Sequence, residues 1–214
     1  SRAMNGRSMK GKAITVAVLL QDLEFGGTQR YALHLLKRMN REVFSPELWV
    51  LRGGDDMLAG AEEAGVKVVR FCNDSWVTPR ALFRMFRRLV GQPPTILYTL
   101  TVVPNIWGRA FGRIAGIPVI ISGYRSVFPK QFESRLWRLS SRIICNAEAL
   151  KEIMIQRHGV APERIAVIPN AVDTDRFCPS PSDRSPDPTV VYVGRLVAEK
   201  DPMNLVRGFR LTAE

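Results

Sequence analysis

The chain has 214 residues, of which 46% are hydrophobic and 24% charged, a composition typical of a globular protein and not of a disordered or fibrous one. Lysine and arginine exceed aspartate and glutamate by 11, which predicts an anionic partner such as a phosphorylated substrate, an acidic lipid or nucleic acid. The longest apolar run, residues 13–20, is far shorter than the roughly 20 residues of a membrane-spanning helix.

Short β-branched runs alternate with amphipathic segments from residue 13 onward, which is the pattern of βαβ units around a parallel sheet. We expect seven strands, at residues 13–20, 47–51, 66–71, 95–99, 118–122, 142–145 and 165–168. Helices are expected between them, at residues 28–39, 57–64, 79–90, 105–115, 130–139 and 147–158. The sequence therefore predicts an α/β fold with a Rossmann-like, doubly wound, mostly parallel sheet over residues 13–177.

Three further segments flank this predicted domain. Residues 1–12 carry no apolar signal-peptide core, and residues 1–3 ahead of Met4 look like the remnant of a cloning step, so we expect a disordered tag there. Residues 178–188 contain four prolines and are expected to form a linker. Residues 189–214 are expected to form a strand at 189–193 and a helix from about Pro202. This single β-α unit either docks on the first domain or begins a second, truncated one.

The cysteines and histidines give no sign of a metal site. Cys72, Cys145 and Cys178 lie far apart and form no CxxC pair, so we interpret them as reduced thiols. His34 and His158 lie away from the ends of the predicted strands, and we expect both to be structural.

Gly26 and Gly27 separate the first predicted strand from the first predicted helix. Residues without a Cβ let another molecule approach the backbone, and the free N–H groups of the first helical turn favour an anion. The spacing is not GxGxxG, so the dinucleotide fingerprint is absent. A phosphate site and an ordinary tight turn both remain open.

Arg195 and Lys200 follow the last predicted strand and precede the last predicted helix. Arginine can bind a phosphate through two hydrogen bonds and lysine acts as a point charge, so the pair is suited to holding a diphosphate. The alternative is that these are exposed loop charges paired with Glu199 and Asp201.

An ordered set of motifs resembles the retaining, nucleotide-sugar-dependent glycosyltransferases of group 1 (family four), over essentially all residues from 13 to 214. The specific combination is PNAVD, at residues 169–173, followed by GRLVAEK, at residues 194–200. Weaker matches are GGTQR, NIWGR, IPVIISGYR and NAEALKE, at residues 26–30, 105–109, 117–125 and 146–152.

The resemblance implies a GT-B fold of two facing Rossmann-like domains, with the acceptor held mainly by the amino-terminal one and the donor mainly by the carboxyl-terminal one. Such enzymes move a sugar, with retention of configuration and without a metal or another cofactor, from a nucleotide diphosphate sugar to an acceptor. By this resemblance Arg195, Lys200, Gly26 and Gly27 would bind the donor diphosphate. Asn170 and Asp173 match the interdomain loop, where we expect them to shape a turn.

The sequence departs from the family pattern where relatives often carry histidines. Tyr98 and Leu100 stand where a His-x-His pair would fall, and Tyr124, followed by Arg125, stands where a further His is common. No catalytic histidine can be named, and Tyr124 and Arg125 become the candidate catalytic residues. The family's Glu-x7-Glu motif would lie beyond Glu214, so we expect this chain alone to be inactive and its parent to be the hexosyltransferase or other glycosyltransferase.

Two segments, residues 79–90 and 128–142, mix arginines with large apolar side chains. They can be interfacial helices on an anionic membrane or ordinary surface helices whose apolar residues face the sheet. Family members that build lipid-linked glycans often associate peripherally with membranes. We therefore expect a cytoplasmic protein, in possible peripheral contact with the inner face of the plasma membrane.

The predicted function is sugar transfer in the synthesis of a surface polysaccharide, lipopolysaccharide or glycolipid, with a lipid-linked or polysaccharide acceptor. Two other classes stay open: another Rossmann-type nucleotide binder, such as an oxidoreductase, and a non-enzymatic basic module for an anionic membrane or a nucleotide ligand. No nucleic-acid motif is present, and nucleic acid is not expected as a partner. The sequence does not name the donor sugar, its nucleotide or the acceptor.

Overall fold

The computed structural model describes residues 13–126, 132–179, 189–194 and 196–212. The chain divides into two units, Ser1–Ala171 and Val172–Glu214, and each is described by itself. The predicted tag and most of the predicted linker lie outside the described residues.

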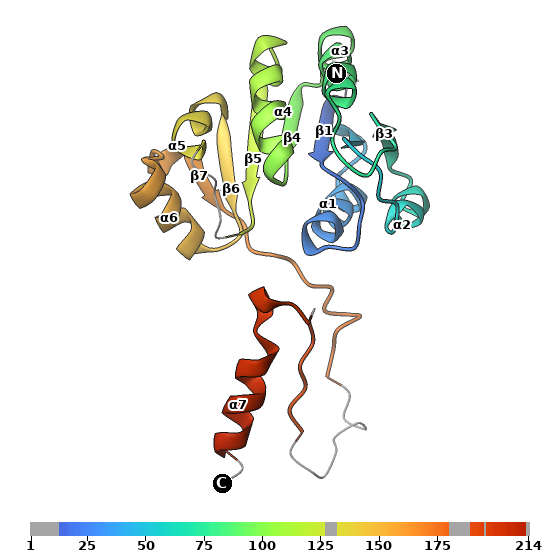
Figure 1. Ribbon diagram of the computed structural model, residues 1–214. Helices are drawn as coiled ribbons and strands as arrows, with labels where there is room; N and C mark the ends of the chain where they lie inside the picture. Colours follow the sequence, from blue (N-terminus) through green and yellow to red (C-terminus); the bar gives the residue numbers. More distant parts are fainter. Residues whose placement is uncertain (1–12, 127–131, 180–188, 195, 213–214) are drawn as a thin grey trace, which may run out of the picture. The chain divides into compact units, whose positions relative to one another are not determined.

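The first unit is built on a seven-stranded sheet in which every pair of neighbouring strands is parallel (Figure 1). The strand order is β3-β2-β1-β4-β5-β6-β7. The strands are β1 (Ile14–Leu20), β2 (Phe44–Val50), β3 (Lys67–Arg70), β4 (Ile96–Thr99), β5 (Val119–Tyr124), β6 (Arg142–Cys145) and β7 (Ile165–Val167). The predicted Rossmann-like α/β class and all seven predicted strands of this unit are confirmed.

Strand β2 begins three residues earlier than predicted, because Pro46 does not interrupt it. The neighbouring strand β3 pairs only with residues 47–50 of β2. One side of β2 is therefore a free edge at Pro46, where a missing N–H breaks no ladder hydrogen bond.

Helices cover both faces of the sheet. The helices are α1 (Gly27–Arg38), α2 (Leu58–Glu63), α3 (Pro79–Gly91), α4 (Val102–Ile114), α5 (Glu133–Leu136) and α6 (Glu148–His158). Helices α1 and α2 pack with β1 and β2 in one apolar cluster, and α3 and α4 pack on the opposite face. Helix α6 packs there too, over β6. The sheet is therefore doubly wound, as predicted.

Strand β1 lies at the centre of this fold and is buried on both sides. Residues 16–20 are each at most 3% exposed, which explains why the strand is a continuous apolar run and not an alternating one. Its neighbours are β2 and β4, whose connecting helices lie on opposite faces. The carboxyl ends of β1 and β4 therefore form the switch point where open α/β sheets bind ligands.

Three further predicted elements differ from the structure. The expected helix at 130–139 is a short α5 followed by a 3-10 helix, Trp137–Leu139, and residues 127–131 lie outside the described residues. Helix α4 begins earlier than predicted because a proline is tolerated in a first helical turn, where Pro104 lies. The expected strand at 189–193 is wrong: the described part of the chain offers this segment no neighbouring strand.

The predicted last helix is confirmed as α7 (Pro202–Thr212). Among the described residues, no helix combines the length and the apolar character that crossing a membrane requires.

Candidate functional site

The carboxyl end of β1 leads through residues 21–26 into α1, at the switch point of the sheet. Asp22 is 6% exposed, and its carboxylate accepts hydrogen bonds from the Gln29 side chain at 2.7 Å and from the Arg52 guanidinium at 2.7 Å. Arg52 also donates to Glu24 at 2.8 Å, and this contact holds the pKa of the Glu24 carboxyl below its usual value. The network fixes the loop ahead of α1.

The two candidate glycines differ in what surrounds them. A Cβ on Gly26 would collide with the side chain of Gln29, whereas a Cβ on Gly27 would have no neighbour within 4 Å. Packing within the described chain therefore does not demand a glycine at position 27. No acidic residue occupies the first turn of α1, so its own N–H groups and helix dipole favour an anion.

Arg125 follows β5 and lies over α1. Its guanidinium carbon is 3.6 Å from the centroid of the Tyr31 ring, and the guanidinium donates a hydrogen bond to the side-chain oxygen of Asn170. The Tyr31 hydroxyl is 3.3 Å from the hydroxyl of Tyr98. Burial lowers the pKa of Arg125, and the charges and hydrogen bonding of the neighbouring tyrosines oppose that shift.

This cluster joins the helix terminus to the arginine. Gly27 and Tyr31 are four residues apart on α1 and share one face of that helix. Arg125 therefore stacks about one turn, roughly 6 Å, from the start of the helix. A fixed cation and free helical N–H groups are thus presented together, an arrangement suited to an anion.

Tyr124, the other candidate catalytic residue, points the opposite way. It is 6% exposed and packs with Cys145, Leu150 and Met154 beneath α6. Its hydroxyl has no hydrogen-bond partner among the described residues. Successive strand residues face opposite sides of a sheet, so Tyr124 belongs to the α6 core and Arg125 to the α1 side.

The positions of the expected His-x-His pair are part of the core. Tyr98 is 4% exposed and Leu100 is fully buried in the cluster beneath α1. Burial raises the pKa of the Tyr98 phenol, as does the hydrogen bond to Tyr31. Tyr98 is therefore neutral at physiological pH, and its buried hydroxyl contacts the hydroxyl of Tyr31.

A buried polar network stiffens the sheet beside this cluster. The Thr99 hydroxyl lies 2.7 Å from the Asn105 side-chain oxygen and 3.1 Å from the Ser122 hydroxyl, and Asn105 donates to the carbonyl of Gly123 at 3.1 Å. Thr101, the residue before α4, has a φ of 70°, a conformation that costs a non-glycine residue about 1–3 kcal/mol. Backbone strain of this kind gathers at ligand sites, and here it lies at the carboxyl end of β4.

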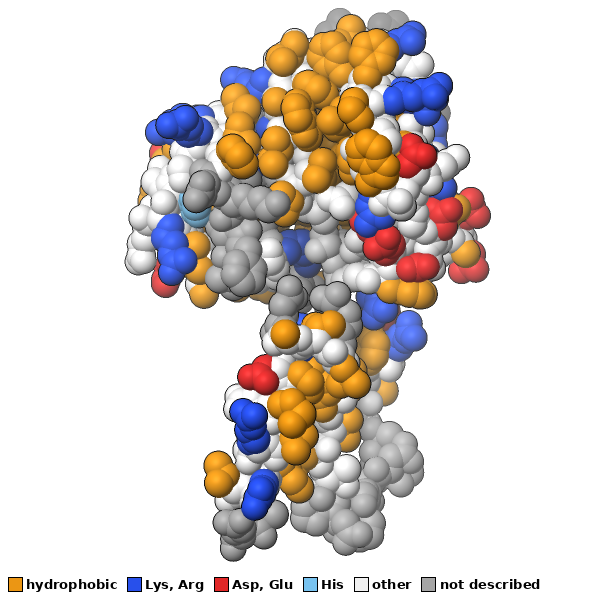
Figure 2. Space-filling model, in the orientation of Figure 1, with side chains coloured by type: hydrophobic (Ala, Val, Ile, Leu, Met, Phe, Trp, Pro, Cys, Tyr) orange, Lys and Arg blue, Asp and Glu red, His pale blue; other side chains and the backbone are white. Residues whose placement is uncertain are grey.

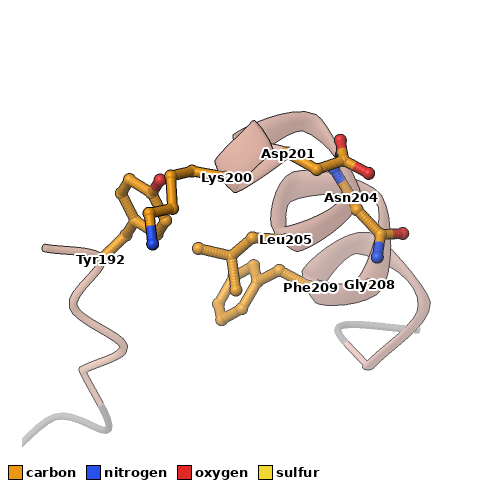
Figure 3. Close-up of a pocket in the computed structure, with 7 residues that line it drawn as sticks. All are labelled: Tyr192, Lys200, Asp201, Asn204, Leu205, Gly208 and Phe209. Atoms are coloured by element: carbon orange, nitrogen blue, oxygen red, sulfur yellow. Dashed lines mark hydrogen bonds between the residues drawn. The ribbon is translucent and has the colours of Figure 1, made fainter. Parts of the chain in front are cut away.

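The second unit carries Lys200, in a 3-10 helix ahead of α7. A pocket of about 560 Å³ is lined by Tyr192, Lys200 and Asp201 together with α7 residues Asn204, Leu205, Gly208 and Phe209. Figure 3 shows the Lys200 side chain extending beside the Tyr192 ring. Arg195 lies outside the described residues, so the predicted Arg195 and Lys200 pair is described only at Lys200.

The remaining predicted residues have local partners. Asp173 accepts a hydrogen bond from the Arg176 amide at 3.2 Å, a turn-forming contact. His34 lies 3.4 Å from Arg38 on α1, and His158 lies 3.0 Å from the Ser134 hydroxyl. The described residues contain no group of three or more His, Cys, Asp or Glu side chains that could hold a metal ion.

Sequence reasoning missed Tyr31, Asp22 and Arg52. Tyr31 occupies an ordinary helical position, and only its spacing of four residues from Gly27 could have indicated a shared face. Asp22 and Arg52 follow adjacent strands, β1 and β2, and the meeting of parallel strand ends at one edge could have paired them.

Comparison with known proteins gives one family and several relatives. The family described as Glycosyltransferase Family 4 matches residues 25–176. A curated relative is UDP-Gal:alpha-D-GlcNAc-diphosphoundecaprenol alpha-1,3-galactosyltransferase of Escherichia coli, 27% identical over 146 residues, which are 58% of this chain and 38% of that protein. One subunit of the human phosphatidylinositol N-acetylglucosaminyltransferase is 43% identical over 61 residues, which are 28% of this chain and 13% of that protein.

Solved structures share the fold. HepE of Anabaena in complex with UDP-glucose matches with a TM-score of 0.63 and 18% identity, over 79% of this chain and 47% of that one. The apo form of the lipopolysaccharide outer core galactosyltransferase WaaB matches with a TM-score of 0.58 and 15% identity, over 80% of this chain and 50% of that one. The chain thus spans at most about half the length of these relatives.

Proposed function

Because the chain belongs to glycosyltransferase family 4, we propose that it is part of an enzyme that transfers a sugar from a nucleotide diphosphate sugar to an acceptor. The observation that carries the proposal is the grouping of Gly27, Tyr31 and Arg125 at the carboxyl edge of the sheet. This edge presents free helical N–H groups beside a cation that two neighbouring elements hold in place.

The proposed chemistry is electrostatic. The bond between the anomeric carbon and the diphosphate oxygen breaks, the acceptor hydroxyl oxygen bonds to that carbon, and the hydroxyl proton leaves with the nucleotide diphosphate. Fixed cations stabilise the negative charge that develops on the departing diphosphate. We assign this role to Lys200, to Arg195 and to Arg125, with Gly26 and Gly27 giving the phosphates access to the backbone.

The proposal extends to stereochemistry and cofactors. Transfer is proposed to retain the anomeric configuration. It is also proposed to need no metal ion, because the lysine and arginines supply the positive charge that a divalent cation would otherwise provide. We expect undiminished transfer in excess chelator. We also expect an α-linked product from an α-linked donor.

The acceptor is proposed to be lipid-linked. The Escherichia coli relative is named for a diphosphoundecaprenol acceptor, and the human relative for phosphatidylinositol. Both acceptors carry a phosphate beside the lipid, which fits the excess of 11 positive charges in this chain.

The test uses the protein in its full reading frame, incubated with a panel of nucleotide sugars with and without a cell-envelope lipid extract, while nucleotide release is measured. We expect release from one donor, stimulated by lipid. The 214-residue chain alone, run in parallel, is expected to release none. A folded full-length protein that releases no nucleotide from any donor contradicts the proposal and favours a non-enzymatic binding module.

A further inference from the structure

Helices α3 and α4 leave a large apolar surface uncovered. A groove of about 310 Å³ runs between them, lined on α3 by Pro79, Leu82, Phe83 and Phe86 and on α4 by Trp107, Phe111 and Ile114. Phe83 is 60% exposed and Ile114 70% exposed. Figure 2 shows hydrophobic side chains gathered over these two helices.

The groove is ordered by aromatic packing. The Phe86 and Phe111 rings meet edge to face with their centroids 5.2 Å apart, and the Trp107 and Phe111 rings are also 5.2 Å apart. The core of α3 is formed by other residues, Ala81, Met85 and Leu89. Leu82 and Phe111 also pack against this core, whereas the groove residues Phe83, Phe86, Trp107 and Ile114 are additional to it.

The two groove helices and the segment between them carry charge of one sign. Residues 79–114 contain six arginines and no aspartate or glutamate. Three of these arginines serve the fold: Arg84 donates to the Phe71 carbonyl, Arg88 pairs with Glu47, and Arg109 is fully buried.

The other three arginines, Arg80, Arg87 and Arg113, are exposed. Within the described part of the chain they make no hydrogen bond or ion pair. Arg80 and Arg87 are seven residues apart and lie on one side of α3, next to the apolar stripe. In the same view the densest group of acidic side chains lies near α2, and one acidic side chain borders the hydrophobic surface (Figure 2).

We propose that the α3–α4 groove docks this protein onto a membrane surface rich in anionic phospholipid, with the apolar side chains inserted among the lipids and Arg80 and Arg87 on the headgroups. An interfacial surface needs this pairing of apolar insertion with cations, and acidic side chains would be repelled from it. The inference rests on the groove and its charges and is independent of sugar transfer.

The test is co-sedimentation of the 214-residue chain with vesicles of phosphatidylcholine and phosphatidylglycerol, compared with pure phosphatidylcholine. Binding is expected to the anionic vesicles and to weaken as salt rises. Arg80→Glu with Arg87→Glu should weaken it by about tenfold or more, because each cation near such a surface contributes roughly a fivefold factor. Phe83→Ser with Ile114→Ser should weaken it as well.

The matched control is Lys37→Glu with Arg157→Glu, which makes the same change of net charge on α1 and α6. This control is expected to bind vesicles nearly as well as the unchanged chain. Equal loss in both charge variants would mean that net charge alone drives binding, and it would overturn the proposal.

Tryptophan fluorescence measures the insertion of the groove residues into the bilayer. Brominated lipids quench tryptophan fluorescence only within the bilayer, so we expect quenching that Trp107→Phe reduces without abolishing sedimentation. Three results overturn the proposal: absence of binding to anionic vesicles, tighter binding to duplex DNA through the same residues, or a dimer in sedimentation equilibrium that Phe83→Ser dissociates.

Discussion

The guanidinium of Arg125 lies on the face of the Tyr31 ring, with its central carbon 3.6 Å from the ring centroid. Stacked in this way, the arginine presents its edge to Asn170 and stays about one helical turn from Gly27. The contact joins the end of β5 to α1 at the carboxyl ends of the strands. It turns a mobile side chain into a positioned cation.

Arg125→Ala is expected to lower sugar transfer by the full-length enzyme about ten- to a hundredfold, the cost of losing one charged hydrogen bond to a phosphate. Arg125→Lys should restore only part of the rate, because an ammonium cannot stack or bind through two parallel hydrogen bonds. Steady-state kinetics with the preferred donor measure both effects.

Tyr31 provides the control for this prediction. Tyr31→Phe keeps the aromatic face but loses the hydroxyl, with its contact to Tyr98 and its hydrogen bonding to Arg125, so transfer should fall less than in Tyr31→Leu. Tyr31→Leu removes the face and should resemble Arg125→Lys. Wild-type rates in Arg125→Ala would show that the arginine only holds α1 and Asn170 together.

The sheet could be predicted from sequence because each strand is a short apolar run bounded by turn residues, and parallel order follows from the intervening helices. Arg125 could be named because it follows Tyr124, which stands where the resembled family often has a histidine. Its stacking on Tyr31 joins residues 94 positions apart, and no periodicity reports such a contact. Alternation along β5 could have separated Tyr124 from Arg125, since neighbouring residues face opposite sides. Arg109 looks like a surface charge and is fully buried. Only the packed structure shows that.

Glu47 ties β2 to its neighbours. It accepts hydrogen bonds from Lys67 of β3, from Arg88 of α3 and from the Trp49 indole at 2.8 Å. Burial alone would raise the pKa of this carboxyl, but the hydrogen bonds from Lys67 and Trp49 and the charge of Arg88 outweigh it, so the pKa is lowered.

Glu47→Gln is therefore expected to lower the free energy of unfolding by about 0.5–1 kcal/mol at pH 7, a modest amount because water screens partly exposed pairs. A lowered folded pKa gives stability that is present above the ordinary pKa of about 4.5 and is lost as the pH falls. The difference between Glu47→Gln and wild type in urea unfolding should thus shrink as the pH falls from 7 to 3. A constant difference at pH 7 and pH 3 would show that the carboxylate charge contributes nothing.

Cys145 should make the fold sensitive to alkali. Burial in β6, helped by the charge of Glu148, raises the pKa of its thiol from 9.0 to about 11. Between these values the unfolded chain loses a proton that the folded chain keeps, so stability falls as the pH rises above about 9, and the loss is complete past about 11.

Urea unfolding at pH 8 and pH 10.5 measures this effect when wild type is compared with Cys145→Ser, whose hydroxyl does not ionise in this range. We expect a smaller loss of stability in the serine variant. Thiol reagents provide an independent check, because the exposed Cys178 should react at pH 8 and the buried Cys145 only after unfolding. Rapid modification of both cysteines in the folded chain would contradict the prediction.

Two glycine substitutions separate binding from stability. A methyl group on Gly27 meets no neighbour within 4 Å, so Gly27→Ala should keep or raise the stability of the chain by up to about 1 kcal/mol. In the full-length enzyme the same methyl group would stand where the phosphates approach the first turn of α1, and we expect a higher KM for the nucleotide sugar.

Gly108→Ala should behave in the opposite way. Its Cβ would lie 2.6 Å from the Thr99 methyl and 2.9 Å from Leu19, beneath α4, so we expect about 1–3 kcal/mol of destabilisation from overpacking. The donor KM of the folded fraction should stay unchanged, because α1 and its N–H groups are untouched. Urea unfolding and donor kinetics on both variants test the pair. If Gly27→Ala also left the KM unchanged, Gly26 and Gly27 would form only a tight turn and would not bind phosphate.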